Sequence, residues 1–244
     1  MKDRPDQAPV PSGEHEPATV SSRSDIDAFL QQVRALGPAP ATGARGRLIF
    51  ALDATMSRQP TWDSACKLQA EMFQEAEKVG GLDIQLVYYR GFGECRASKW
   101  VSQTRRLADL MTRIDCRGGH TQIEKVLKHA RRETEAEKVA ALVFVGDAME
   151  EPLDRLCTAA GELGLLSVAA FMFQEGSDPV AEQAFREVAR LTRGAYCRFQ
   201  PGAAHELSEL LRAAAAYAAG GMRALADLSA RSGVGTRKLL QQLS

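Results

Sequence analysis

The stretch that decides the fold reads Arg47-Leu48-Ile49-Phe50-Ala51-Leu52-Asp53-Ala54-Thr55-Met56-Ser57. An apolar run leads into an acid, which is followed by two hydroxyl residues at a spacing of two. In an extended chain, side chains at positions i, i+2 and i+4 point to the same side. Asp53, Thr55 and Ser57 can therefore converge at the carboxyl end of a buried strand. Oxygen ligands suit a hard divalent cation, so this stretch predicts the beginning of a metal site.

Outward from this stretch, apolar strand patterns alternate with amphipathic helix patterns. We expect further strands at 82–89, 94–101, 139–145, 165–173 and 195–199, and helices at 61–79, 102–115, 123–136, 152–164, 179–192 and 203–219. Strands that are apolar throughout are typical of a parallel sheet covered on both faces. The Gly91-Phe92-Gly93 connection is too short for a parallel crossover, so residues 94–101 should form an antiparallel edge strand.

These patterns predict an α/β fold. We expect a Rossmann-like, doubly wound, mainly parallel six-stranded sheet with one antiparallel edge strand and helices on both faces. Composition divides the chain into a disordered tail at 1–23, a short docking helix and linker at 24–45, the α/β domain at 46–221, and a C-terminal tail or helix at 222–244. A single domain with extensions follows from this division.

Two later residues can join the first three. Thr121 ends the stretch Arg117-Gly118-Gly119-His120-Thr121, and Asp147 follows the strand expected at 139–145. Ligands of open parallel sheets lie beyond the carboxyl ends of the strands, where all these residues fall. Taken singly, each residue could merely cap the next helix. Their joint occurrence, in this order, favours a metal site made by Asp53, Thr55, Ser57, Thr121 and Asp147.

This combination resembles the metal-ion-dependent adhesion site (MIDAS) of the von Willebrand factor type A (VWA) domain, in its intracellular bacterial form. The resemblance spans about residues 46–219. It implies that Thr55 and Ser57 bind Mg²⁺ directly, with Mn²⁺ or Ca²⁺ as alternatives. It also implies a direct or water-bridged contact from Thr121, and contacts mainly through water from Asp53 and Asp147. Two departures are Thr55, where the family most often has serine, and Gly146-Asp147-Ala148 in place of the commoner Thr-Asp-Gly.

A site of this kind is expected to bind a partner. Neutral hydroxyls do not balance the positive charge of the cation, and these residues leave one of its coordination positions without a protein ligand. An Asp or Glu from a partner can fill that position. We therefore expect a metal-dependent protein-binding adaptor, with selectivity set by the loops at 58–60, 117–120 and 148–152. Glu150 and Glu151 near the rim should disfavour very acidic partners. By family analogy, ATPase and chaperone systems are candidate partners.

Composition excludes several other classes of function. Lysine plus arginine and aspartate plus glutamate both number 31, so no long-range field favours nucleic acid or an anionic membrane. No apolar run approaches the roughly 20 residues needed to cross a bilayer, and the N-terminus lacks the pattern of a secretion signal. The five cysteines are scattered, which argues against a disulfide framework and a zinc site. We expect a cytoplasmic monomer.

Two alternatives stay open. The first alternative is an enzyme. The sequence contains no phosphate-binding P-loop, dinucleotide-binding glycine pattern or nucleophile elbow, so the usual motifs of nucleotide hydrolases, dehydrogenases and serine hydrolases are missing. A phosphatase of the haloacid dehalogenase type would need an acid where Thr55 stands, and a metal-dependent hydrolase would have His120 as its only candidate base. The second alternative is a metal-independent structural adaptor that uses the helix at 26–36 or the tail around 237–240.

Overall fold

The computed structural model describes residues 45–59, 82–199 and 211–220. The helices expected at 26–36 and 61–79, the tails, and the domain boundaries proposed at residues 23 and 221 lie outside these residues. Among the described residues, no helix is long and apolar enough to span a membrane.

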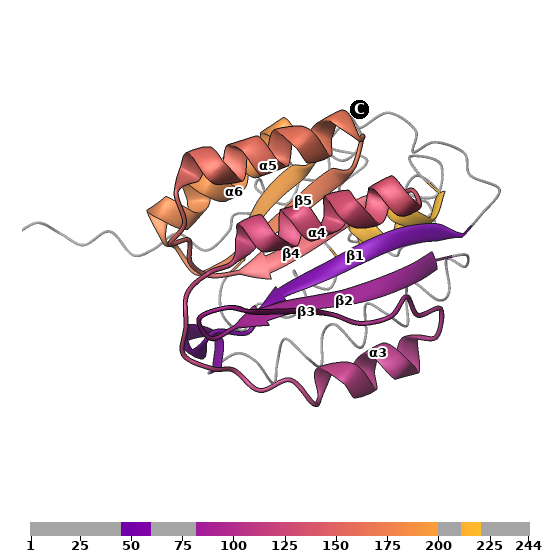
Figure 1. The fold of residues 1–244 in the computed structure, drawn as a ribbon, viewed down its shortest axis with the longest axis horizontal. Helices are drawn as coiled ribbons and strands as arrows, with labels where there is room; N and C mark the ends of the chain where they lie inside the picture. Colours follow the sequence, from indigo (N-terminus) through magenta and orange to yellow (C-terminus); the bar gives the residue numbers. More distant parts are fainter. Residues whose placement is uncertain (1–44, 60–81, 200–210, 221–244) are drawn as a thin grey trace, which may run out of the picture.

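In the described part of the chain, six strands form one sheet, drawn in Figure 1. They are β1 (Gly46–Asp53), β2 (Leu82–Arg90), β3 (Glu94–Ala97), β4 (Ala141–Gly146), β5 (Ala169–Glu175) and β6 (Ala195–Phe199). Their order is β3-β2-β1-β4-β5-β6, and every neighbouring pair is parallel except β2 and β3. The predicted fold class, including the antiparallel edge strand, is confirmed.

Helices cover both faces of the sheet. The helices are α3 (Thr104–Met111), α4 (Ile123–Ala136), α5 (Leu153–Leu165) and α6 (Pro179–Leu191), with a short 3-10 helix, η1 (Met56–Arg58), after β1. In Figure 1, α4, α5 and α6 lie on one face and α3 lies on the other. A helical segment at 211–220 packs with α3 in the same apolar cluster.

An apolar core lies on each face of the sheet. The strands contribute to both cores because successive side chains of a strand point to opposite faces. Along β1, Leu48 and Phe50 belong to the cluster on the side of α3, whereas Ile49 and Ala51 belong to the cluster under α4, α5 and α6. All of these side chains are fully buried. This double burial explains why β1 is apolar at consecutive positions.

The third strand is shorter than the sequence pattern predicts, because it ends at Ala97 and not at residue 101. Ser98 explains the difference. Its backbone N–H donates to the Leu86 carbonyl at 2.8 Å, but its own hydroxyl accepts from the Leu86 N–H at 3.0 Å. A side chain thereby replaces the next backbone acceptor of the ladder, and pairing resumes only at an isolated bridge between Ile84 and Val101.

Candidate metal centre

The candidate site lies at the carboxyl end of β1, where the chain is fixed between two neighbours. The Ala54 N–H donates to the Tyr89 carbonyl at 3.0 Å, and the Arg117 N–H donates to the Ala54 carbonyl at 3.0 Å. Thr55 and Arg117 also form an isolated parallel bridge. These contacts hold the loop after β1 beside the segment that precedes α4.

Asp53 is fully buried at the end of β1. One carboxylate oxygen accepts from the Thr55 N–H at 2.8 Å, and the other accepts from the Tyr89 hydroxyl at 2.9 Å. Burial raises the pKa of Asp53 to about 6, with a further contribution from the charge of Asp147, while the hydrogen bonds from Thr55 and Tyr89 act in the opposite direction. Burial also raises the pKa of Tyr89 well above 10, so this phenol stays a hydrogen-bond donor.

Thr55 and Ser57 bring two hydroxyls together beside Asp53. Their oxygens are 3.1 Å apart. The predicted extended geometry holds for Asp53 and Thr55, but the chain then turns into η1, so Ser57 reaches this position through a helical turn. Thr55 is buried and Ser57 is exposed, so the candidate ligand oxygens extend from the interior of the protein to its surface.

Asp147 follows β4, the strand beside β1. Gly146 packs closely against the site, because a Cβ atom there would lie 3.4 Å from the Asp53 Cβ and 2.8 Å from the Phe144 ring. Asp147 is near enough to Asp53 for its charge to raise the pKa of that carboxyl. One carboxylate oxygen of Asp147, Oδ1, is buried and has no hydrogen-bond partner among the described residues. Buried polar atoms of this kind call for a partner.

Thr121 is buried in the loop before α4. Its hydroxyl accepts from the Glu150 N–H at 2.9 Å, and its own N–H donates to the Glu150 carboxylate at 3.0 Å. The interpretation of Thr121 as a helix cap is therefore wrong. Glu151 caps α4, because its carboxylate accepts from the N–H groups of Ile123 and Glu124 at 2.5 and 3.0 Å.

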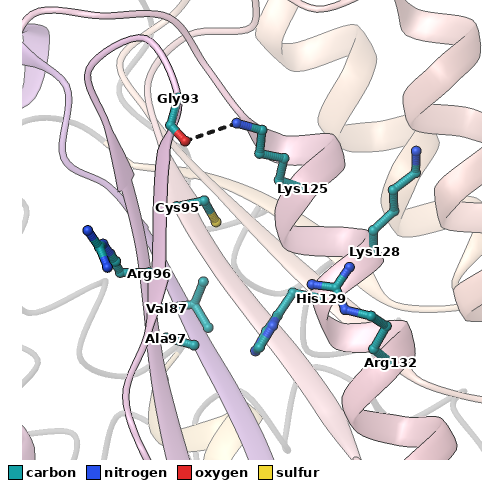
Figure 2. A pocket seen from close by; sticks show the side chains of 9 residues that line it. All are labelled: Val87, Gly93, Cys95, Arg96, Ala97, Lys125, Lys128, His129 and Arg132. Atoms are coloured by element: carbon teal, nitrogen blue, oxygen red, sulfur yellow. Dashed lines mark hydrogen bonds between the residues drawn. The ribbon is translucent and has the colours of Figure 1, made fainter.

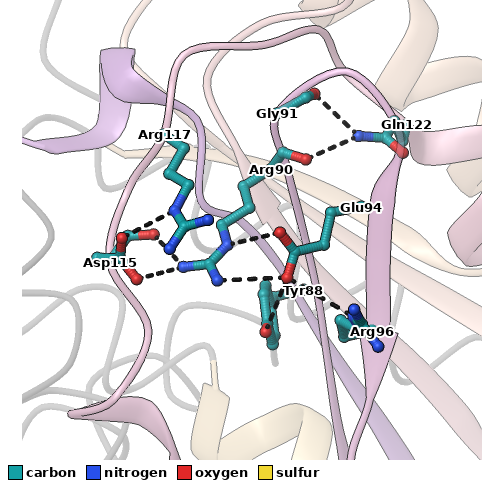
Figure 3. A network of polar contacts seen from close by, with 8 residues as sticks. All are labelled: Tyr88, Arg90, Gly91, Glu94, Arg96, Asp115, Arg117 and Gln122. Carbon is teal, nitrogen blue, oxygen red and sulfur yellow. Dashed lines mark hydrogen bonds and ion pairs between the residues drawn. The ribbon is translucent and has the colours of Figure 1, made fainter.

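A polar network fixes the loop that carries Thr121, as Figure 3 shows. Arg90 donates to the Asp115 carbonyl at 2.9 Å and pairs with the carboxylates of Asp115 and Glu94. Gln122 donates to the carbonyls of Arg90 and Gly91, both at 3.2 Å. The hairpin between β2 and β3 thus holds both ends of the segment 115–122.

Arg58 is the residue that the sequence reasoning missed. Its side chain is 1% exposed and pairs with Glu175, a buried acid at the end of β5. Burial lowers the pKa of Arg58, and the charges of Asp147 and Asp53 act in the opposite direction. The prediction that residues 58–60 form a selectivity loop is wrong for Arg58, because its guanidinium lies inside the protein, near enough to Asp53 and Asp147 for their charges to affect its pKa.

The donor set fits a hard cation. Asp53, Thr55 and Ser57 are joined by direct contacts, and Asp147 is near enough for its charge to raise the pKa of Asp53. Thr121 is joined by hydrogen bonds to Glu150, in the loop that follows Asp147. Within residues 45–59, 82–199 and 211–220, no three His, Cys, Asp or Glu side chains gather so that they could hold a metal ion. A cation here would therefore depend on the hydroxyls, as expected for Mg²⁺ bound by oxygen alone.

Comparison with known proteins gives a result at the level of the fold. No family model and no curated protein matches the sequence. A von Willebrand factor type A structure from Catenulispora acidiphila aligns with a TM-score of 0.59 and 16% identity, over 73% of this chain. The chain spans only 43% of the length of that protein.

Two further solved structures also align with this chain at the level of the fold. The SpRpn10 VWA domain aligns with a TM-score of 0.57 and 13% identity, over 69% of this chain and 94% of that domain. An aerotolerance-related membrane protein from Bacteroides fragilis aligns with a TM-score of 0.53 and 17% identity, over 68% of this chain and 98% of that one. The strand order, the antiparallel edge strand and these alignments together show that the chain has the α/β fold of VWA domains.

Proposed function

We propose that the protein is a metal-dependent protein-binding adaptor whose site is made by Asp53, Thr55, Ser57, Thr121 and Asp147. The partner supplies an Asp or Glu that completes the coordination of Mg²⁺, with Mn²⁺ or Ca²⁺ as alternatives. The observation that carries the proposal is that the Thr55 and Ser57 hydroxyls meet beside the buried Asp53, while the buried Oδ1 of the nearby Asp147 has no hydrogen-bond partner among the described residues. A cation would satisfy that oxygen and offset the repulsion between Asp147 and Asp53.

The chemistry of these residues favours binding over catalysis. Bound Mg²⁺ would supply a positive centre that attracts a carboxylate. Hydrolysis would also need a base, and the candidate His120 is exposed, with its Nδ1 3.3 Å from the Glu150 carboxylate. Thr121 is held by Glu150 as well, so both residues are engaged in fixing the loop. We therefore propose an adaptor and not an enzyme, acting as a cytoplasmic monomer.

We propose that the partner belongs to an ATPase or chaperone system. One similar structure is the VWA domain of SpRpn10. Together with the family analogy, this likeness makes a subunit of an ATPase or chaperone system a reasonable partner to seek. The fold alone does not decide the partner, because one fold hosts many functions.

Affinity capture tests this proposal. The tagged full-length chain is incubated with an extract of its source cells, once with Mg²⁺ and once with a chelator, and captured proteins are identified by mass spectrometry. We expect one partner that requires the cation, is lost with Thr55→Ala, and is lost when a single Asp or Glu of the partner is replaced. Equal capture of that partner in chelator would contradict the proposal.

The buried positive charge of Arg58 favours a second candidate function, that of a metal-independent adaptor. The buried guanidinium already provides a positive charge beside Asp53 and Asp147. If that charge is sufficient, the same surface would bind partners without a cation. Capture that survives the chelator but is lost with the double variant Arg58→Met and Glu175→Gln, which leaves no buried unpaired acid, would support this second candidate.

A further inference from the structure

A groove of about 270 Å³ lies between the edge strand β3 and helix α4, away from the candidate metal centre. Figure 2 shows its two walls. Cys95 and Ala97 line it from β3, and Lys125, Lys128, His129 and Arg132 line it from α4. The side chain of Arg96 points to the opposite face of the strand in the same view. The wall on α4 therefore gives the groove its positive charge.

Two of these cations carry charge that the groove does not neutralise. Lys125 donates to the Gly93 carbonyl at 3.1 Å and to the Gln122 side chain at 2.7 Å, and both acceptors are neutral. Arg132 is exposed, and no ion pair joins Lys125 or Arg132 to an acid in the described parts of the chain.

The other two basic side chains contribute less. Lys128 pairs with Glu124 at 2.6 Å. Burial lowers the pKa of His129 below its ordinary value of 6.5, and its ring lies 2.8 Å from the Gln85 carbonyl oxygen. Burial therefore disfavours the charged form of His129. The free positive charge of the groove lies at its two ends, on Lys125 and Arg132.

The open side of the groove is a strand edge. β3 is the last strand of the sheet, and no described strand pairs with its outer side. Ser98 is bonded to Leu86, the residue opposite it, and hydrogen-bonded pairs alternate with non-bonded pairs along an antiparallel ladder. Arg96 and Glu94 therefore bond to β2, whereas the backbone groups of Cys95 and Ala97 point outward. Such groups are a template for another strand.

We propose that this edge binds an extended acidic segment of a partner protein, which adds to the sheet beside β3. Residues of the new strand opposite Cys95 and Ala97 place their side chains on the face of α4. Alternate residues of a strand are about 7 Å apart, and Lys125 and Arg132 are separated by about 10 Å along the helix. Two acids at alternate positions can therefore reach both flexible cations. Backbone bonds would supply affinity and the acids would supply selectivity.

Charge reversal tests the selectivity. A fluorescent peptide with glutamate at alternate positions is titrated with the full-length chain in chelator, and binding is followed by anisotropy. We expect Lys125→Glu with Arg132→Glu to weaken binding by about tenfold or more at moderate salt. Arg106→Glu with Arg113→Glu, an equal change of charge at two exposed positions in and just after α3, on the other side of the sheet, should alter it by less than about twofold. Equal losses in both variants, or no binding of the peptide, would overturn the proposal.

Hydrogen exchange tests the geometry. Bound peptide should slow exchange of the Cys95 and Ala97 amides and leave the Arg96 amide unchanged, since that amide already faces β2. A peptide N-methylated at alternate residues should fail to bind. Slowing at none of these amides, or full binding of the methylated peptide, would contradict strand addition. Binding should persist in Asp53→Asn, so failure of the metal site and failure of this edge site can be told apart.

Discussion

Arg58 places a fixed positive charge beside the two aspartates of the candidate metal centre. Its guanidinium is buried with Glu175, and a buried charge of this kind survives only with acidic partners. The positive charge of Arg58 would repel a divalent cation bound near Asp53 and Asp147. The affinity of the site for Mg²⁺ should therefore be limited by Arg58.

The double variant Arg58→Met with Glu175→Gln tests this limit. It removes the guanidinium without leaving Glu175 buried and unpaired, so we expect Mg²⁺ affinity to rise by about tenfold. Isothermal titration calorimetry measures the change. The matched double variant Arg131→Met with Glu162→Gln removes a partly exposed pair on α4 and α5, joined at 2.8 Å, and should leave the affinity unchanged. An unchanged or weaker affinity in the first double variant would show that Arg58 does not oppose the cation.

Residue patterns placed Asp53 and Thr55 correctly at the carboxyl end of β1, because an apolar strand followed by an acid is visible in the sequence. Arg58 could not be predicted in the same way. A charged residue after a turn is usually exposed, and its partner Glu175 comes close only through the order of the strands. The roles of Glu150 and Glu151 were hidden for a similar reason, since both act on a loop about 30 residues earlier in the chain.

Among the helices, α4 depends on a cap supplied from another loop. Glu151 accepts hydrogen bonds from the Ile123 and Glu124 N–H groups, and the local N-cap Gln122 supplies none from its side chain. Glu151→Ala should lower the free energy of unfolding by about 1 to 2 kcal/mol. Denaturant titration measures this loss. Glu135→Ala, at an exposed position of the same helix, should cost less than about 0.5 kcal/mol, and a similar loss in both variants would argue against the cap.

The hairpin network of Figure 3 predicts a dependence of stability on pH. Hydrogen bonds from Arg117 and then Arg90 lower the pKa of Asp115 from 3.8 to about 2. A carboxyl with a lowered pKa stabilises the fold above its ordinary pKa, and this contribution is lost as pH falls toward 2. Asp115→Asn should therefore be less stable than the unaltered chain above pH 4, and the difference should shrink between pH 4 and 2.

Denaturant unfolding at several pH values measures this dependence. Asp109→Asn, an equal change at an exposed position of α3, serves as the control. A stability difference for Asp115→Asn that stays constant between pH 4 and 2 would contradict the assignment. The exposed position of Asp115 makes the effect small, because solvent screens such pairs.

The boundaries of helices and strands were predicted best where the hydrophobic periodicity agrees with the cap, glycine and proline signals at the ends of the element. The helix at 123–136 and the strand at 195–199 match the structure at both ends. The edge strand is shorter than expected because Ser98 uses its side chain to end the ladder, a contact that periodicity does not reveal. Helix α3 is also shorter than expected, at both ends. Local patterns thus locate elements, while tertiary hydrogen bonds decide where some of them stop.

At the scale of the whole molecule, the alternation of strands and helices was enough to predict the architecture. Parallel strands need crossovers, and the single short connection at Gly91-Phe92-Gly93 identified the one antiparallel pair. Agreement between pattern and structure is strongest here because each strand is buried on both faces. The fold places the carboxyl ends of β1 and β4 side by side, so the closeness of the residues that follow these strands could be anticipated from the order of the elements.

The central claim is that this molecule binds a divalent cation through Asp53 and its neighbours. Calorimetric titration of the full-length chain with Mg²⁺ tests it most directly, using Asp53→Asn beside Asp178→Asn, an equal change at the N-cap of α6, where asparagine caps as well as aspartate. We predict a single binding event in the unaltered chain and in Asp178→Asn, and none in Asp53→Asn. Equal heat in Asp53→Asn, or no heat in the unaltered chain at millimolar Mg²⁺, would contradict the account.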